Sequence, residues 1–126
     1  MTEDDVLDTL QRYASEHFPR TCGCGRRYPT LRAYIESTVP TGSATSYDAE
    51  LGDWDTTRPI GAIVLSNCRC GSTLALSTEH VPLDQQLALL RWFRAESEAR
   101  GLTVTALLES LRARVRQRVL AEPPAG

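Results

Sequence analysis

The stretch SNCRCGSTLAL, residues Ser66–Leu76, places two cysteines one residue apart, follows them with a glycine and continues into alternating polar and apolar residues. The stretch TCGCGRRY, residues Thr21–Tyr28, contains the same Cys-x-Cys-Gly pattern. All the cysteines of the 126-residue chain lie in these two copies, as Cys22, Cys24, Cys68 and Cys70. Two short-spaced pairs of thiols are typical of a tetrahedral Zn²⁺ site that the fold brings together. The cysteines therefore predict one structural zinc ion.

Two other uses of the four thiols compete with zinc. A redox or disulfide role is one, although neither pair lies at a helix start as in thioredoxin-like motifs. An iron–sulfur cluster is the other, although these spacings match none of the familiar ferredoxin patterns. His17 and His80 are ligands by type, but we expect His17 on the apolar face of the first helix and His80 in the loop before Pro82. Zinc bound by the four cysteines remains the favoured prediction.

A glycine follows the second cysteine of each pair, where a residue that can adopt positive φ lets the backbone curl around a metal. With these glycines the two motifs, Cys22–Gly25 and Cys68–Gly71, resemble a zinc ribbon, a fold group in which two cysteine turns clamp one structural zinc. The resemblance covers about residues 20–78, and each pair has one intervening residue where ribbons generally have two. Zinc ribbons occur in transcription, translation and assembly proteins, so the resemblance implies a metal rather than one function.

The rest of the chain predicts an α+β scaffold in a single domain, residues 1–121, with a flexible tail at 122–126. Apolar residues at helical spacing predict an N-terminal helix, with Thr2 as its cap and Pro19 at its end. Partial alternation and β-branched residues predict an antiparallel hairpin from residues 60–67 and 72–78, with the second cysteine pair at its turn. The segment RAYIEST, residues 32–38, is either a third strand or a short helix, and we favour the strand.

Two helices are predicted at the C-terminal end as a hairpin within residues 82–120. The first spans 82–100 and ends at Gly101, and the second has one apolar row. Leu89 and Trp92 widen the apolar arc of the first helix beyond a single stripe. We expect the final helix and the β-hairpin to cover this arc, and otherwise these two residues would form a homodimer or partner interface.

Between these parts, residues 40–59 are rich in Gly, Ser, Thr, Asp and Pro and predict a long, acidic loop. Trp54 lies among its acidic residues. Because a tryptophan buries a large area, we expect Trp54 to fold back onto the core. The alternative is an exposed recognition loop in which Trp54 is part of a partner surface.

The net charge of −2 and the pI of about 5.7 argue against a protein that binds polyanions with its whole surface. All 14 basic residues are arginines. Those close to the cysteines in sequence are Arg20, Arg26, Arg27, Arg32 and Arg69. They either offset the charge of a zinc–thiolate site or contact phosphate, with Tyr28 and Tyr34 as stacking partners. The arginines of the final helix flank both sides of its apolar row, and we expect them to solvate its edges: Arg112, Arg114, Arg116 and Arg118.

The sequence carries no catalytic signature, and four cysteines around zinc leave no open coordination position. We therefore expect no enzyme and no small-molecule substrate. No apolar run is long enough to span a bilayer, and the acidic start MTEDDVLDTL does not resemble a secretion signal, so a cytoplasmic protein is expected. The favoured function is a zinc-binding protein-interaction or regulatory module whose partner is another protein or a second copy. The alternatives are a nucleic-acid-associated, transcription-type regulator and, third, a thiol redox switch.

Overall fold

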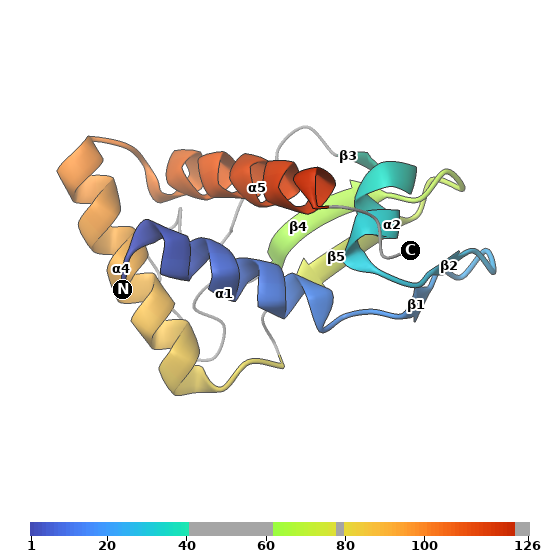
Figure 1. The fold of residues 1–126 in the computed structure, drawn as a ribbon, viewed down its shortest axis with the longest axis horizontal. Helices are drawn as coiled ribbons and strands as arrows, with labels where there is room; N and C mark the ends of the chain where they lie inside the picture. Colours follow the sequence, from blue (N-terminus) through green and yellow to red (C-terminus); the bar gives the residue numbers. More distant parts are fainter. Residues whose placement is uncertain (41–61, 78–79, 123–126) are drawn as a thin grey trace.

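The computed structural model describes residues 1–40, 62–77 and 80–122 (Figure 1). These residues form an α+β fold, which confirms the predicted class. The elements in chain order are α1 (Glu3–Ser15), β1 (Arg20–Thr21), β2 (Arg27–Tyr28), α2 (Leu31–Ser37), β3 (Val39–Pro40), β4 (Ala62–Asn67), β5 (Thr73–Ser77), α4 (Leu83–Arg100) and α5 (Val104–Ala121). No helix within the described residues combines the length and the apolar character needed to cross a bilayer.

The N-terminal helix begins as predicted. The side chain of Thr2 accepts a hydrogen bond from the backbone N–H of Asp5 at 3.2 Å, and the Asp5 carboxylate accepts one from the N–H of Thr2 at 2.9 Å. This reciprocal capping box satisfies two N–H groups that a helix start leaves without partners. One face of α1 is buried in the core, and its residues are Val6, Leu7, Leu10, Tyr13 and Ala14.

Residues 32–38 differ from the prediction, because they lie in helix α2 and its cap and not in a strand. Thr30 caps this helix by accepting a hydrogen bond from the N–H of Ala33 at 3.1 Å. Leu31, Tyr34 and Ile35 then fall on one buried face at helical spacing. The N-cap and the helical spacing of the buried residues favour a helix and outweigh the β-propensity of the segment.

The strands form two small antiparallel sheets. In the first, β1 pairs with β2, with Arg20 opposite Tyr28. In the second, the order is β3-β4-β5, and the predicted β4–β5 hairpin is present with Asn67 opposite Thr73. The hydroxyl of Thr73 donates to the side-chain oxygen of Asn67 at 2.7 Å, next to the second cysteine pair. Each sheet therefore ends in a turn that carries two cysteines.

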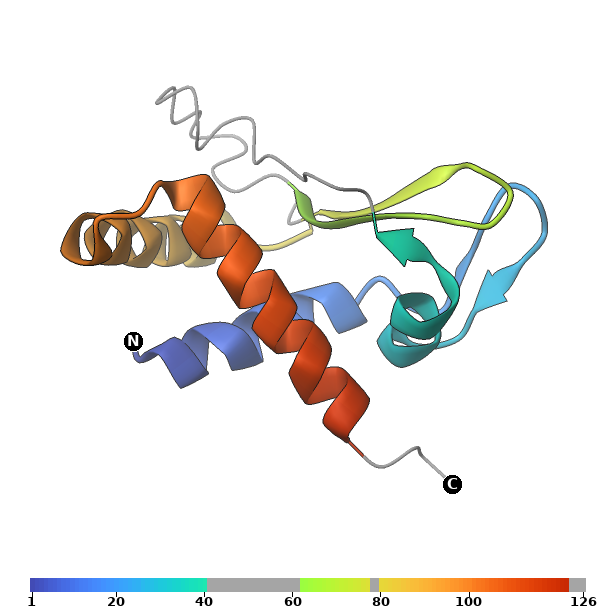
Figure 2. The same cartoon turned by 90° about the horizontal axis from the view of Figure 1, so that it is seen from above.

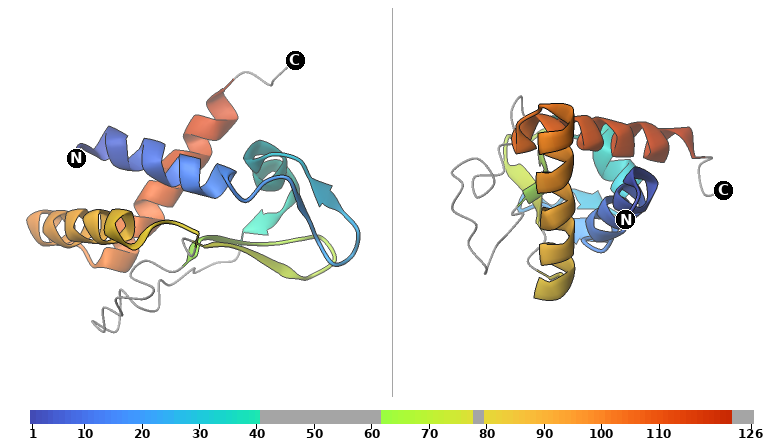
Figure 3. Two further views of the ribbon diagram at one scale, coloured as in Figure 1. Left: turned by 90° about the horizontal axis from the view of Figure 1, so that it is seen from below. Right: turned by 90° about the vertical axis from the view of Figure 1, so that its left-hand side faces the viewer.

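Helices α1, α4 and α5, which we call the helical body, supply most of the hydrophobic core. The two C-terminal helices are present, but α4 and α5 cross steeply where a hairpin predicts antiparallel packing (Figure 3). Leu89 of α4 is 0% exposed, and Trp92 is partly buried against the core. Leu89 is thus not available to a partner, because the apolar arc of α4 is used inside the molecule.

The structure describes the first residue of the predicted tail but almost none of the predicted acidic loop. Residues 41–59 of the predicted acidic loop, which include Trp54, lie outside the described residues, as do residues 60 and 61 of the predicted hairpin. Glu122, the first residue of the predicted tail, makes hydrogen bonds with the body of the protein. Its carboxylate accepts a hydrogen bond from the side chain of Gln11 at 3.0 Å, and its carbonyl oxygen accepts one from Arg32.

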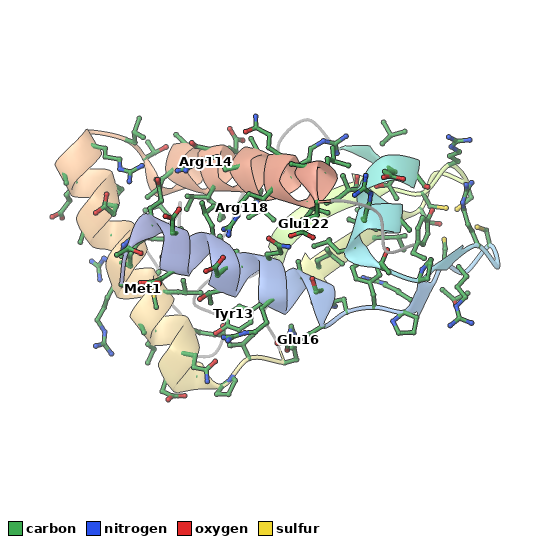
Figure 4. All side chains as sticks on the ribbon, viewed as in Figure 1. Met1, Tyr13, Glu16, Arg114, Arg118 and Glu122 are labelled. Atoms are coloured by element: carbon green, nitrogen blue, oxygen red, sulfur yellow. The ribbon has the colours of Figure 1, made fainter. Side chains whose placement is uncertain are left out.

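The arrangement places the cysteines at one end of the molecule. The turn between β1 and β2 and the turn between β4 and β5 lie side by side there, with α4 at the opposite end (Figure 2). Sulfur atoms gather at this end in the side-chain view (Figure 4). We refer to residues 21–27 and 67–73 together as the cysteine tip.

Candidate metal centre

The two turns of the cysteine tip have the same backbone design. In the first, the N–H of Cys22 donates to the carbonyl of Arg26 at 2.8 Å, and the N–H of Gly25 donates to the carbonyl of Cys22 at 2.9 Å. The second turn repeats both hydrogen bonds at 2.8 Å, from Cys68 to Ser72 and from Gly71 to Cys68. The repeated Cys-x-Cys-Gly pattern therefore encodes a repeated turn.

The glycine in each turn has the conformation that the sequence pattern predicts. The φ angles are +94° at Gly25 and +97° at Gly71. L-residues with a side chain rarely adopt this part of conformational space, whereas glycine does so freely. Each glycine thus lets its turn close back toward the cysteine that begins it.

The fold brings the four predicted ligands together. All four Sγ atoms lie within 4.8 Å of one another, with 3.6 Å between Cys22 and Cys70 and 3.7 Å between Cys24 and Cys68. Four sulfurs at the typical zinc–sulfur distance of about 2.3 Å, in a tetrahedron, are separated by about 3.8 Å. A disulfide requires about 2.0 Å, and all four cysteines are free. The separations therefore fit four ligands around one ion.

The N–H groups of each turn point at sulfur atoms. The pKa of the Cys68 thiol is lowered to about 6, first by a hydrogen bond from the backbone of Cys70 and then by one from the Tyr28 hydroxyl. Hydrogen bonds from the side chain and then the backbone of Ser72 lower the pKa of Cys70. Donors aimed at sulfur stabilise thiolates, the form that binds a metal.

Cys24 shows the limit of this stabilisation. The backbone of Arg26 donates a hydrogen bond that lowers its pKa, but its contacts with Cys22 and Cys70 and its desolvation outweigh that bond and raise the pKa to about 11. Crowded thiols cannot all ionise, because like charges repel at these separations. A bound dication would remove this repulsion and let all four sulfurs become ligands.

Tyr28 is a hydrogen-bond donor to the cysteine cluster, a role that the sequence pattern does not predict. Its hydroxyl donates a hydrogen bond to the Sγ of Cys68 at 3.0 Å, and the side chain is 1% exposed. Burial, followed by this hydrogen bond, raises the pKa of Tyr28 to about 12, so the hydroxyl keeps the proton that it donates. The only signal in the sequence is the position of Tyr28, in the strand that leaves the first cysteine turn.

Tyr34 also lies inside the fold. It is 1% exposed, its ring contacts that of Tyr28 at 6.1 Å, and its hydroxyl donates to the carbonyl of Leu74 at 2.6 Å. Stacking on a base requires an exposed aromatic face. The predicted use of Tyr28 and Tyr34 as stacking partners is therefore wrong, since both rings are buried.

The arginines near the cysteines divide into two kinds. Arg20 is half-buried, and its guanidinium donates to the carbonyl of Ala75, which joins β1 to β5. Arg26, Arg27 and Arg69 are exposed on the cysteine tip. Arg20 is thus a structural contact, and the other three remain available at the surface.

Neither histidine belongs to the cluster of ligand atoms. The Nε2 of His80 lies 3.0 Å from a carboxylate oxygen of Glu16, and the rings of His17 and His80 meet edge to face at 4.8 Å. Both side chains lie beside the C-terminal end of α1. This placement agrees with the expectation that neither replaces a cysteine.

No family model, curated protein or solved structure matches this chain. The resemblance to zinc ribbons therefore rests on the two motifs and on the geometry of the four sulfurs. That geometry establishes a candidate metal site made of Cys22, Cys24, Cys68 and Cys70.

Proposed function

We propose that this protein is a small interaction or regulatory module in which one structural zinc ion, bound by the four cysteines, holds its two sheets together. The observation that carries the proposal is the set of sulfur separations, 3.6 and 3.7 Å between the turns, which matches a tetrahedral site. The ion would tie the β1–β2 turn to the β4–β5 turn, which are far apart in the sequence.

Zinc explains the site better than the other uses of thiols. An iron–sulfur cluster places several irons and inorganic sulfides between its thiolates, whereas these sulfurs lie within 4.8 Å of one another, the size of a single-ion site. Iron–sulfur clusters also follow characteristic cysteine spacings that this chain lacks. A redox switch remains the third candidate, and the state of the thiols distinguishes it from a permanent zinc site.

The proposed role is structural and not catalytic. Four sulfur ligands complete the coordination of zinc, so neither water nor substrate has a position on the ion. The consequence of binding is a fixed surface, which a partner can recognise. We infer that this partner is a macromolecule, with another protein or a second copy favoured and nucleic acid as the alternative. We also infer that a cytoplasmic location keeps the thiols reduced.

Metal analysis of the purified 126-residue protein tests the proposal. We expect one zinc per chain in the wild type and little or none in Cys68→Ser, which lacks a buried ligand. Gly23→Ala is the matched control, because it alters the residue between two ligands while a Cβ there meets nothing within 4 Å. Iron in place of zinc, or full zinc in Cys68→Ser, would contradict the proposal.

Alkylation of the thiols separates structural zinc from a redox switch. In the structural case, the thiols of the purified protein react slowly, and chelation makes all four react. A redox switch would instead give disulfide-linked cysteines that become reactive only after reduction. Recovery of such disulfides from protein prepared without oxygen would favour the switch.

A further inference from the structure

The arginines of this chain are used very differently in two places. On the helical body, Arg100 and Arg114 pair with Glu3, and Arg118 pairs with Asp8. On the cysteine tip, the exposed guanidinium groups make neither an ion pair nor a hydrogen bond with any residue in the described part of the chain: Arg26, Arg27 and Arg69. Unpaired arginines on one exposed end are free to bind an anion.

The surroundings of these arginines contain no competing carboxylate in sequence. Residues 19–31 and 66–77 include four arginines and neither aspartate nor glutamate. A zinc ion with four thiolates carries two negative charges, which leaves the region an excess of two positive charges when Arg20 is counted. The net negative charge of the whole chain therefore does not describe these two segments.

The arginine side chains can offset the charge of the thiolates through space, but they are not the hydrogen-bond partners of the sulfur atoms. The sulfur atoms receive their hydrogen bonds from backbone N–H groups, from Ser72 and from the hydroxyl of Tyr28. None of the hydrogen bonds to sulfur among the described residues comes from a guanidinium. The guanidinium N–H groups of the three exposed arginines are thus not engaged in hydrogen bonds to sulfur.

We propose that the cysteine tip binds the phosphate backbone of double-stranded nucleic acid through Arg26, Arg27 and Arg69. The proposal rests on the proposed function, since the zinc ion fixes the two turns that present these arginines. A guanidinium donates two parallel hydrogen bonds to a phosphate, a geometry that lysine cannot offer. Three such groups on two neighbouring turns match a chain of phosphates better than one small anion.

The form of the partner follows from what surrounds the arginines. Single strands are held by stacking bases on exposed aromatic rings, but Tyr28 and Tyr34 are each 1% exposed. A small phosphate compound favours an enclosing pocket. Two cavities among the described residues, one of about 360 Å³ bounded by Phe18 and Val119 and one beside Arg114 and Gln117, are lined by none of these arginines. Among the described residues, this basic end has no exposed aromatic ring for stacking, and such an end fits a duplex backbone, which is bound without reading sequence.

The test is binding of the zinc-loaded protein to a 20-base-pair duplex of mixed sequence, measured by fluorescence anisotropy from 50 to 200 mM salt. The tip variant is Arg26→Gln/Arg27→Gln/Arg69→Gln. The control is Arg12→Gln/Arg91→Gln/Arg116→Gln, which removes the same charge from exposed positions elsewhere. We expect the tip variant to bind about tenfold or more weakly, with a salt dependence reduced by about one unit of slope for each arginine, and the control to retain its binding.

Several outcomes would overturn the proposal. Equal losses in the tip variant and the control would show a general charge effect, and no binding by the zinc-loaded wild type at 50 mM salt would exclude the duplex. Tighter binding to a single strand or to polyglutamate would assign the tip to another partner. DNA and RNA duplexes form separate arms of the titration. Zinc is measured in every sample, so a failure of metal binding is distinguished from a failure of nucleic-acid binding.

Discussion

The helical body and the cysteine tip are stabilised by different means. In the body, residues from three helices interlock, and Leu7, Leu10, Leu89, Leu107 and Leu111 are each at most 1% exposed. In the tip, only Cys22 and Cys68 are buried, and the other residues of both turns are exposed or half-buried. Burial of apolar area can hold the body together, but it cannot hold the tip. In the proposed function, a bound ion would take the place of a core at this end.

The largest expected effect comes from removing the metal. Chelation should abolish hydrogen-exchange protection at the hydrogen-bonded amides of Cys22, Gly25, Cys68 and Gly71, while amides of α1 and α5 stay protected. The reason is that metal binding supplies about 10–16 kcal/mol in small zinc-dependent peptides, whereas the body has its own core. Hydrogen exchange followed by mass spectrometry measures both regions in one sample. Protection that persists in the tip, or is lost everywhere, would contradict the conclusion that the tip and the body are stabilised by different means.

The reverse perturbation should weaken the body and spare the tip. Leu107 is 0% exposed, and Leu107→Ala should lower the free energy of unfolding by about 2–5 kcal/mol through lost burial and a residual cavity. Zinc content should remain at the wild-type level. Chemical denaturation and metal analysis give the two values.

Leu120→Ala is the control for that substitution. Leu120 lies on the same helix but is 36% exposed, so its removal should change stability by about 0.5 kcal/mol or less. Loss of zinc in Leu107→Ala would show that the metal site depends on the body, against the separation described above.

The helical body and the cysteine tip are predicted from the sequence by different signals. The helices of the body follow from apolar periodicity and caps, as with Thr2 and Gly101, because those signals are local. The ligands of the tip follow from cysteine spacing, because only a few chemistries use paired thiols. The sequence pattern of α2 is compatible with either a helix or a strand, since its seven residues give a short pattern that both can carry.

Contacts between distant segments could not be predicted in this way. Nothing local marks Tyr28 as a donor to Cys68, which is 40 residues away, or Arg114 as a partner of Glu3. Such pairs depend on how elements pack, and the sequence pattern of each element is satisfied by several arrangements. The burial of Leu89 agrees with the expectation that the apolar arc of its helix is covered inside the molecule.

A smaller effect on the tip is expected from Tyr28→Phe, which removes one hydroxyl and keeps the ring. The Cys68 thiolate loses its side-chain donor, and loss of such an outer contact typically lowers metal affinity by about 10-fold to 100-fold. Competition with a chromophoric chelator measures the affinity. Tyr13→Phe is the matched control, because it removes a 2.8 Å hydrogen bond to Gln85 in the body and should leave zinc affinity unchanged. Equal effects of the two substitutions would refute a specific role for Tyr28.

The smallest effect concerns the paired arginines of the body. Arg114 of α5 reaches Glu3 of α1, and Figure 4 shows Arg118 between the same two helices. The hydrogen bond from Arg114 is the main cause that lowers the pKa of Glu3 below its ordinary value near 4.5. Because the pKa is lower in the folded state, the pair stabilises the fold above that ordinary value, and the contribution is lost as pH falls through the folded pKa.

Arg114→Gln should therefore cost about 0.2–1 kcal/mol at pH 7, since both side chains remain partly exposed, and the difference from wild type should shrink at pH 3. Urea denaturation of the two proteins at both pH values measures this difference. A loss of zinc at low pH affects both proteins equally and therefore cancels in the difference. Arg27→Gln on the tip is the comparison, because that arginine has no ion pair within the described residues and should leave stability unchanged at either pH. A cost at Arg27 equal to that at Arg114 would mean that the tip arginines also serve the fold, which would remove the basis for assigning them to a partner.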